Sequence, residues 1–176
     1  MLEIEVKILE IEEQAIRKKL EAMGAKIAFD GQIRNLYMDT PDEAYKKSDC
    51  VVRLRKKGER SLLTFKKRLD QTEAKVCEEH EVEVSDFDEM RAILEAMGLR
   101  ANLDMYKHRT SYRLKDAQFE IDRYQKPHAG IPVFLEIEAK TLKMVHKYAE
   151  SLGFDRAQCR PWSTWELIAH YHTYIT

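Results

Sequence analysis

The sequence predicts an α+β protein with an eight-stranded antiparallel sheet and flanking helices. Segments in which every second residue is apolar recur along the chain, and this alternation is typical of β-strands. The order strand, helix and three strands occurs twice, and Leu-Glu-Ala-Met-Gly closes the helix in both halves, at 20–24 and 94–98. A chain of 176 residues suits one domain. We therefore expect a single domain over residues 1–176.

The first half begins with a strand whose two faces differ sharply. In residues 1–8, Glu3, Glu5 and Lys7 alternate with aliphatic residues. Residues 11–23 carry apolar residues at helical spacing and are followed by Gly24, a residue type that commonly ends helices. Further strands are predicted at 33–39, 50–57 and 61–67.

The second half repeats this order and is followed by a helical end. A helix is predicted at 86–97, with Asp86 as its cap. Residues 141–176 predict two helices whose aromatic residues are expected to pack on the barrel, with a dimer face as the alternative. A monomer or a homodimer is expected accordingly. Strands are predicted at 76–84, 105–114, 117–124 and 133–140, and loops at 40–49 and 125–132.

The overall charge limits the classes of partner. Lys and Arg total 30, and Asp and Glu total 31, so the net charge of −1 argues against a general nucleic-acid binder. No apolar run approaches the roughly 18 residues of a membrane span, and the acidic start lacks the features of a signal peptide. The three cysteines form no CxxC pair, which predicts reduced thiols. We expect a cytoplasmic protein that does not bind membranes.

The charges of the predicted strands fall on one face of each strand. Charged residues make up 35% of the chain, against about 25% in an average protein. A solvated sheet face with cross-strand ion pairs would explain any single strand. Across eight strands the pattern also fits a sheet closed into a barrel, with apolar faces under the helices and ionic faces around a tunnel. Buried charges of that kind need partners, which an anionic ligand with divalent cations would supply.

Several motifs, taken in order, resemble the CYTH superfamily, the triphosphate tunnel metalloenzymes. Glu3-x-Glu5-x-Lys7 matches the ExExK signature of that family, and Tyr37-Met-Asp39-Thr40-Pro41 resembles its YxDT segment. The resemblance covers about residues 1–140, and it implies an eight-stranded antiparallel tunnel that binds a triphosphate with Mg²⁺ or Mn²⁺. The remaining matches are Arg53-Leu-Arg55, Lys66, Glu81-Val-Glu83, Lys107-His-Arg109, Asp122 and Glu136-Ile-Glu138.

Residue chemistry assigns roles to these positions. A triphosphate is a polyanion that Lys and Arg neutralise, and Arg suits bidentate phosphate contacts. Hard divalent cations prefer oxygen ligands. By family resemblance, Lys7 and Tyr37 act together as a general base for the attacking water. The predicted triphosphate ligands are Lys7, Arg53, Arg55, Lys66, Lys107 and Arg109; the predicted metal ligands are Glu3, Glu5, Asp122, Glu136 and Glu138; Glu81 and Glu83 are predicted to support them.

Three functions remain open from the sequence. Hydrolysis of an inorganic, nucleoside or thiamine triphosphate needs little recognition beyond the phosphates, and it is the favoured prediction. A class IV adenylate cyclase would convert ATP into cyclic AMP and pyrophosphate, and it would also have to hold adenine and ribose. A non-catalytic module that binds polyphosphate or RNA 5′-triphosphate is the third reading. The sequence contains neither a P-loop nor a GxGxxG motif, so other common phosphate sites are not supported.

Overall fold

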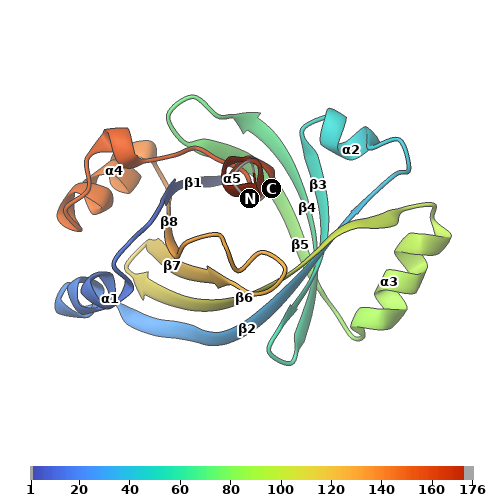
Figure 1. Ribbon diagram of the computed structural model, residues 1–176, viewed down its shortest axis with the longest axis horizontal. Coiled ribbons are helices and arrows are strands. Elements are labelled where there is room, and N and C mark those ends of the chain that lie inside the picture. The colour runs from blue at the N-terminus through green and yellow to red at the C-terminus, as the bar shows by residue number, and fades with distance from the viewer. Residues whose placement is uncertain (1, 173–176) are drawn as a thin grey trace.

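A computed structural model describes residues 2–172 and contains a closed eight-stranded barrel (Figure 1). Neighbouring strands are antiparallel, and their order around the barrel is β1-β5-β4-β3-β2-β6-β7-β8. The predicted α+β barrel is confirmed. The strands are β1 (Leu2–Ile8), β2 (Lys26–Asp39), β3 (Cys50–Lys57), β4 (Arg60–Asp70), β5 (Lys75–Val84), β6 (Arg100–Leu114), β7 (Ala117–Tyr124) and β8 (Phe134–Ala139).

The helices flank the barrel. In Figure 1, α1 and α4 lie on one side of it, and α2 and α3 lie on the other. The prediction of a loop over 40–49 was wrong in part, because α2 occupies four of these residues. No helix within residues 2–172 is both long and apolar enough to cross a membrane. The α-helices are α1 (Glu13–Ala22), α2 (Ala44–Lys47), α3 (Phe87–Ala96), α4 (Leu142–Ser151) and α5 (Thr164–His172).

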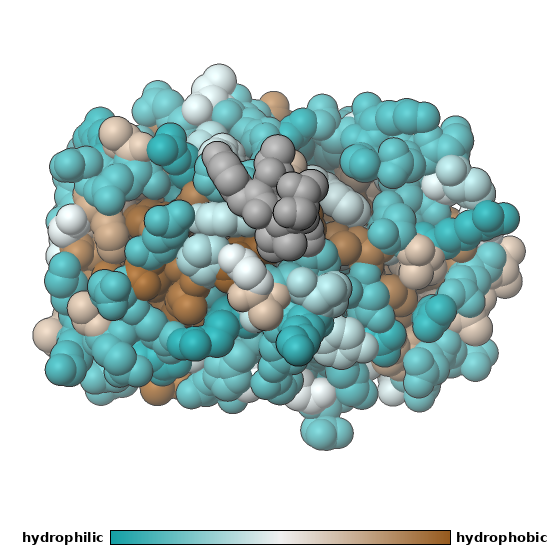
Figure 2. All heavy atoms as spheres, viewed as in Figure 1, coloured by the Kyte–Doolittle hydropathy of each residue, from teal (hydrophilic) through white to brown (hydrophobic). Residues whose placement is uncertain are grey.

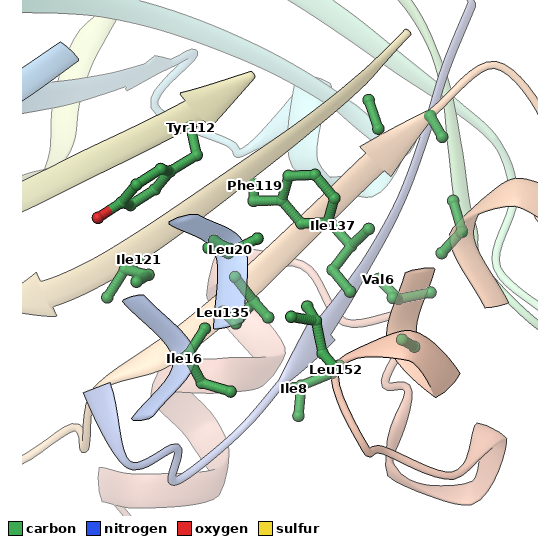
Figure 3. Packing of buried hydrophobic residues seen from close by; sticks show 14 of the residues in the cluster. Val6, Ile8, Ile16, Leu20, Tyr112, Phe119, Ile121, Leu135, Ile137 and Leu152 are labelled. Carbon is green, nitrogen blue, oxygen red and sulfur yellow. The ribbon is translucent and has the colours of Figure 1, made fainter. Parts of the chain in front are cut away.

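The apolar faces of the strands point outward, under the helices. Val6 and Ile8 of β1 pack with Ile16 and Leu20 of α1 and with apolar residues of β7 and β8 (Figure 3). A second cluster holds α3 against β2 and β3, around Leu94. Because side chains alternate along a strand, burying these residues outside turns their charged neighbours into the barrel. Figure 2 shows hydrophobic residues gathered between α1 and α4, on a face that is otherwise mostly hydrophilic.

The segment that leads into α5 pairs with the barrel at Lys7. The backbone N–H of Lys7 donates to the carbonyl of Arg160 at 2.8 Å, and the N–H of Arg160 donates back at 2.8 Å. Ser163 and Glu166 then cap α5 reciprocally, since the backbone N–H of each donates to the side chain of the other. This cap fixes the first turn of α5 where it lines the interior of the barrel.

Candidate functional site

The interior of the barrel is a cavity of about 890 Å³ lined mainly by charged side chains. All but two of the predicted site residues line it. They come from different strands, so barrel closure brings together residues that are far apart in the sequence. The predicted residues that line the cavity are Glu3, Glu5, Lys7, Tyr37, Arg53, Arg55, Lys66, Glu81, Lys107, Arg109, Glu136 and Glu138.

Acidic residues concentrate on three adjacent strands, β8, β1 and β5, which we call the acidic wall. Glu5 of β1 lies opposite Glu138 of β8, and Lys7 lies opposite Glu136 one step further along. Glu3 of β1 and Glu79 of β5 each form an ion pair with Lys66, at 2.5 and 3.0 Å. The acidic wall thus carries six carboxylates that line the cavity: Glu3, Glu5, Glu79, Glu81, Glu136 and Glu138.

Lys7 is held by two of these carboxylates. Its Nζ lies 2.8 Å from Glu136 and 3.3 Å from Glu5, and its side chain is almost wholly buried. Burial alone would lower the pKa of Lys7, but Glu136 and Glu5 outweigh it and raise that pKa above its usual range. Lys7 is therefore an ammonium in this structure, and it neutralises part of the acidic wall.

Glu138 has no such cation. Within residues 2–172 its carboxylate forms neither an ion pair nor a side-chain hydrogen bond, although Glu5 faces it across the strand pair. Burial, reinforced by Glu3 and Glu5, raises the pKa of Glu138 to about 7. Glu5 differs because Lys7 and Lys75 offset its burial and lower its pKa. Glu138 is therefore the carboxylate of the acidic wall beside which an additional cation would be most favourable.

The donor chemistry of the acidic wall fits a hard divalent cation. Mg²⁺ and Mn²⁺ take carboxylate oxygens, and Glu138 with Glu5 provides two facing carboxylates with one left uncompensated. No three acidic, His or Cys side chains of the described chain converge as a ready-made metal cluster. Three of these carboxylates, those of Glu3, Glu136 and Glu5, instead form ion pairs with Lys66, Lys7 and Lys75 respectively.

Basic residues concentrate across the barrel on β3 and β6, on either side of β2, which we call the basic wall. Arg53 and Arg55 alternate on β3, and Lys107 and Arg109 alternate on β6. Arg53 lies only at the limit of an ion pair, 3.9 Å from Glu79 and 4.0 Å from Glu81, and its buried Nε has no partner in the described structure. The charge of Arg53 is thus only partly neutralised by neighbouring carboxylates.

Arg109 is the most heavily compensated member of the basic wall. Its guanidinium is 4% exposed and contacts Asp122, Glu136 and Glu120. Asp122 is fully buried and also accepts from Lys107 at 2.6 Å, so both of its oxygens are engaged. Burial and the neighbouring Arg109 lower the pKa of Lys107 to about 8 in spite of this pair.

Tyr37 lies in the cavity wall beside α5. Its hydroxyl is 3.1 Å from Oγ1 of Thr164, and its ring packs at 5.8 Å from that of Trp165. Burial raises the pKa of Tyr37, but Arg53 and Lys107 outweigh burial and lower it. The structure does not bring Tyr37 and Lys7 into hydrogen-bond contact: the Tyr37 hydroxyl pairs with Thr164, and the Lys7 ammonium pairs with Glu136 and Glu5.

Two predicted residues lie outside the lining of the cavity. Asp122 is fully buried behind it and accepts hydrogen bonds from Arg109 and Lys107. Glu83 is half exposed at the end of β5, where Arg60 pairs with it at 2.9 Å.

The residues that line the cavity but were not predicted as site residues include Lys75, Glu79, Gln118 and Glu120. Glu79 and Glu120 share the strand phase of predicted neighbours, and that phase was the available signal. Lys75 ends up opposite Glu5 through the pairing of β1 with β5. That register is set by tertiary structure rather than by any local pattern.

The sequence model of the CYTH domain matches residues 1–156. A protein of Methanocaldococcus jannaschii, provisionally named an adenylate cyclase, is 25% identical over 138 residues, which is 78% of this chain and 77% of the relative.

Solved structures extend the similarity to the whole fold. A Pyrococcus horikoshii OT3 protein is 27% identical, with a TM-score of 0.80 and coverage of 94% of this chain and 98% of that one. A candidate adenylyl cyclase from Hippeastrum, described with a dominant triphosphatase activity, is 15% identical and has a TM-score of 0.67. It covers 96% of this chain and 95% of its own, and its likeness concerns the fold alone.

Proposed function

Since the chain belongs to the CYTH domain family, whose members bind triphosphates, we propose that it hydrolyses a triphosphate in the cavity of its barrel. The substrate class is a linear triphosphate, either free or attached to an organic group such as a nucleoside or thiamine. The proposed cofactor is Mg²⁺ or Mn²⁺.

One observation carries this proposal: the barrel separates its charges into two facing walls. The basic wall has cations with incomplete partners, at Arg53 and Arg55. The acidic wall has a carboxylate, that of Glu138, which forms no ion pair within residues 2–172. A metal–triphosphate complex carries an anion and a cation side by side, and it would complete both walls at once.

The residues of the basic wall would bind the phosphate oxygens. Arg53 and Arg55 offer guanidinium N–H groups, which match phosphate geometry, and Lys107 adds an ammonium beside them. These contacts hold the triphosphate along the cavity and stabilise negative charge that shifts between phosphate oxygens during bond cleavage. Arg109 is proposed to contribute through the field of its guanidinium, since carboxylates already hold its N–H groups.

The residues of the acidic wall would hold the cation. Glu138 and Glu5 are the proposed inner ligands, with Glu3 and Glu136 beside them, and Asp122 is proposed to act through the cations it holds. A bound divalent cation supplies charge neutralisation at the phosphate and lowers the pKa of a coordinated water. Tyr37 and Lys7 are proposed to steer the attacking water, with Lys7 acting as a protonated, charged group in the arrangement seen here.

A second candidate function is an adenylate cyclase. It is favoured by the name of the Methanocaldococcus jannaschii relative, and it would use the same walls for the phosphates of ATP. The two reactions differ in the nucleophile and in the bond that breaks. Hydrolysis places water at the terminal phosphorus, whereas cyclisation places the ribose 3′-hydroxyl at the α-phosphorus and releases pyrophosphate.

The products of one set of incubations separate these functions. Purified protein is incubated with ATP, thiamine triphosphate or inorganic triphosphate, each with Mg²⁺ or Mn²⁺. Orthophosphate release is the expected result, whereas cyclic AMP with pyrophosphate from ATP, without orthophosphate, would favour the cyclase. An Arg55→Gln variant, purified in parallel and assayed at substrate concentrations well below KM, is the control, since an activity equally strong in that preparation would belong to a contaminant. Absence of turnover with every pair would contradict both enzymes.

A further inference from the structure

Asn35 and Arg55 form a directly opposed pair inside the barrel. They lie across from each other in the pairing of β2 with β3, and the Nε of Arg55 donates to the side-chain oxygen of Asn35 at 2.9 Å. Asn35 shares the strand phase of Tyr37, which lines the cavity, and it is 1% exposed. Arg55 itself lines the cavity. Asn35 therefore lies behind Arg55 as seen from the cavity.

The orientation of this amide is determined by its partner. The Nε of Arg55 has only a hydrogen to offer, so the oxygen of Asn35 must face it and the amide nitrogen must point away. That nitrogen, Nδ2, is buried and has no hydrogen-bond partner in the described structure. A buried donor without an acceptor is unfavourable. The Asn35 amide is thus buried at a cost in free energy, and Arg55 is the hydrogen-bond partner of its oxygen.

The neutrality of this partner distinguishes Arg55 from Arg109, another arginine that lines the cavity. Arg109 lies opposite Asp122 in the pairing of β6 with β7, and carboxylates occupy its guanidinium. Arg55 instead lies opposite the amide of Asn35, and no carboxylate within residues 2–172 forms an ion pair with it. Asn35 fixes the Nε side of the guanidinium and leaves its charge and its terminal N–H groups uncommitted.

We propose that Asn35 is a positioning residue that holds Arg55 ready for phosphate without neutralising it. This inference rests on the proposed function, because it requires a phosphate chain in the cavity. The guanidinium is fixed at one edge by a neutral acceptor, so its two terminal nitrogens face the ligand already oriented. Pre-orientation reduces the side-chain entropy that binding would otherwise cost. An acidic residue at position 35 would orient Arg55 equally well but would compete with the phosphate for its charge.

Two substitutions at one position separate this role from a merely structural one. Asn35→Asp keeps the size and the acceptor but adds a negative charge, whereas Asn35→Ala removes the acceptor and adds no charge. Affinity for inorganic triphosphate is measured by calorimetry without metal, alongside KM and kcat with Mg²⁺. We expect Asn35→Asp to weaken binding by about 10- to 100-fold, the loss of one charge-assisted contact, and Asn35→Ala to weaken it less. A purely structural role predicts the reverse order, and that order would overturn the inference.

A matched control separates this local effect from the general charge of the cavity. Gln118→Glu adds the same charge to the lining of the cavity, on β7 rather than opposite Arg55. If Gln118→Glu weakens metal-free triphosphate binding as much as Asn35→Asp does, the effect is not specific to Arg55 and the inference fails. In an Arg55→Gln background, Asn35→Asp should cost little further affinity. A full additional loss there would contradict the pairing as well.

A measurement on the wild type tests the inference even if the variants at position 35 do not fold. Nitrogen-15 NMR of the arginine side chains, with the Arg55 signal assigned from Arg55→Lys, reports the guanidinium directly. Inorganic triphosphate should shift the Arg55 Nε–H signal and slow rotation of its terminal nitrogens. An unchanged signal at saturating triphosphate would overturn the inference alone. A wild type that binds no triphosphate would overturn the proposed function together with it.

Discussion

Glu5 and Glu138 face each other across the pairing of β1 with β8, and in the described part of the chain only Glu5 of the two forms ion pairs. Like charges directly opposite each other on a sheet are destabilising. The structure relieves Glu5 with Lys7 and Lys75, and it leaves Glu138 with a raised pKa. This asymmetry makes Glu138 the residue at which pH, metal and stability should be most closely linked.

Glu138→Gln should raise the free energy of unfolding of the metal-free protein, and the size of this gain should depend on pH. The folded pKa of Glu138, about 7, exceeds its ordinary value of 4.5, so the folded state binds more protons between these values. Its contribution to the free energy of unfolding therefore falls as pH rises through this window. Relative to the wild type, Glu138→Gln should gain on the order of 2 kcal/mol at pH 8 and little at pH 4.

Thermal unfolding in EDTA between pH 4 and 8 measures this difference. Glu78→Gln is the control, because Glu78 lies on the acidic wall's β5 but is exposed. Mg²⁺ should stabilise the wild type more than Glu138→Gln if Glu138 is a metal ligand. Equal stabilisation of the two proteins by Mg²⁺ would remove Glu138 from the ligand set.

Arg55 and Arg109 should respond differently to the same substitution. Arg109→Gln leaves Asp122, Glu120 and Glu136 buried without their common cation, which should lower the free energy of unfolding by about 3–5 kcal/mol. Arg55→Gln leaves no carboxylate unpaired, so it should change stability little and raise KM about tenfold or more. Chemical denaturation and steady-state kinetics on inorganic triphosphate test both statements. Similar stability losses in both variants would contradict this division of roles.

Strand alternation was sufficient to predict which side chains enter the barrel, but it did not reveal how deeply each one lies. Arg53 and Arg55 were placed correctly because a strand has only two faces. Asp122 has the same phase as Glu120, yet it is fully buried behind Arg109, because depth depends on the side chains that pack above it. The opposed pair of Asn35 and Arg55 depends on the register of β2 on β3, which no local pattern encodes.

The other departures from prediction have similar physical causes. Helix α2 is four residues long, too short to show a helical period, so residues 44–47 gave no signal. The ion pair of Lys7 with Glu136 was not predicted either, because it arises from the pairing of β1 with β8. Ion-pair partners on neighbouring strands become known only with the order of strands around the barrel.

Substitutions of Glu81 and Glu83 should differ in their effect on catalysis, although the two residues lie on the same face of β5. Glu81 accepts from the hydroxyl of Thr64 at 2.9 Å and lies near Arg53, whereas Glu83 pairs with exposed Arg60. Glu81→Gln should lower kcat/KM by roughly 3- to 10-fold by loosening Arg53. Glu83→Gln should leave kcat/KM and stability close to wild type, because exposed ion pairs contribute little. Kinetics of the two variants on one substrate check this contrast, and an equal loss in both would show that Glu83 reaches the site.

Tyr37→Phe tests whether the Tyr37 hydroxyl takes part in the chemistry. The variant keeps the ring that packs against Trp165 and loses only the hydroxyl, so the cavity wall should be preserved. If the hydroxyl steers or activates the attacking water, kcat should fall by roughly 10²–10⁴-fold while KM changes little. Thr164→Val is the matched comparison, since it removes the partner of the hydroxyl at 3.1 Å and retains the hydroxyl itself. A smaller loss is expected there. A wild-type kcat in Tyr37→Phe would make Tyr37 part of the wall only, and activation of the water would then rest on the carboxylates and the cation they hold.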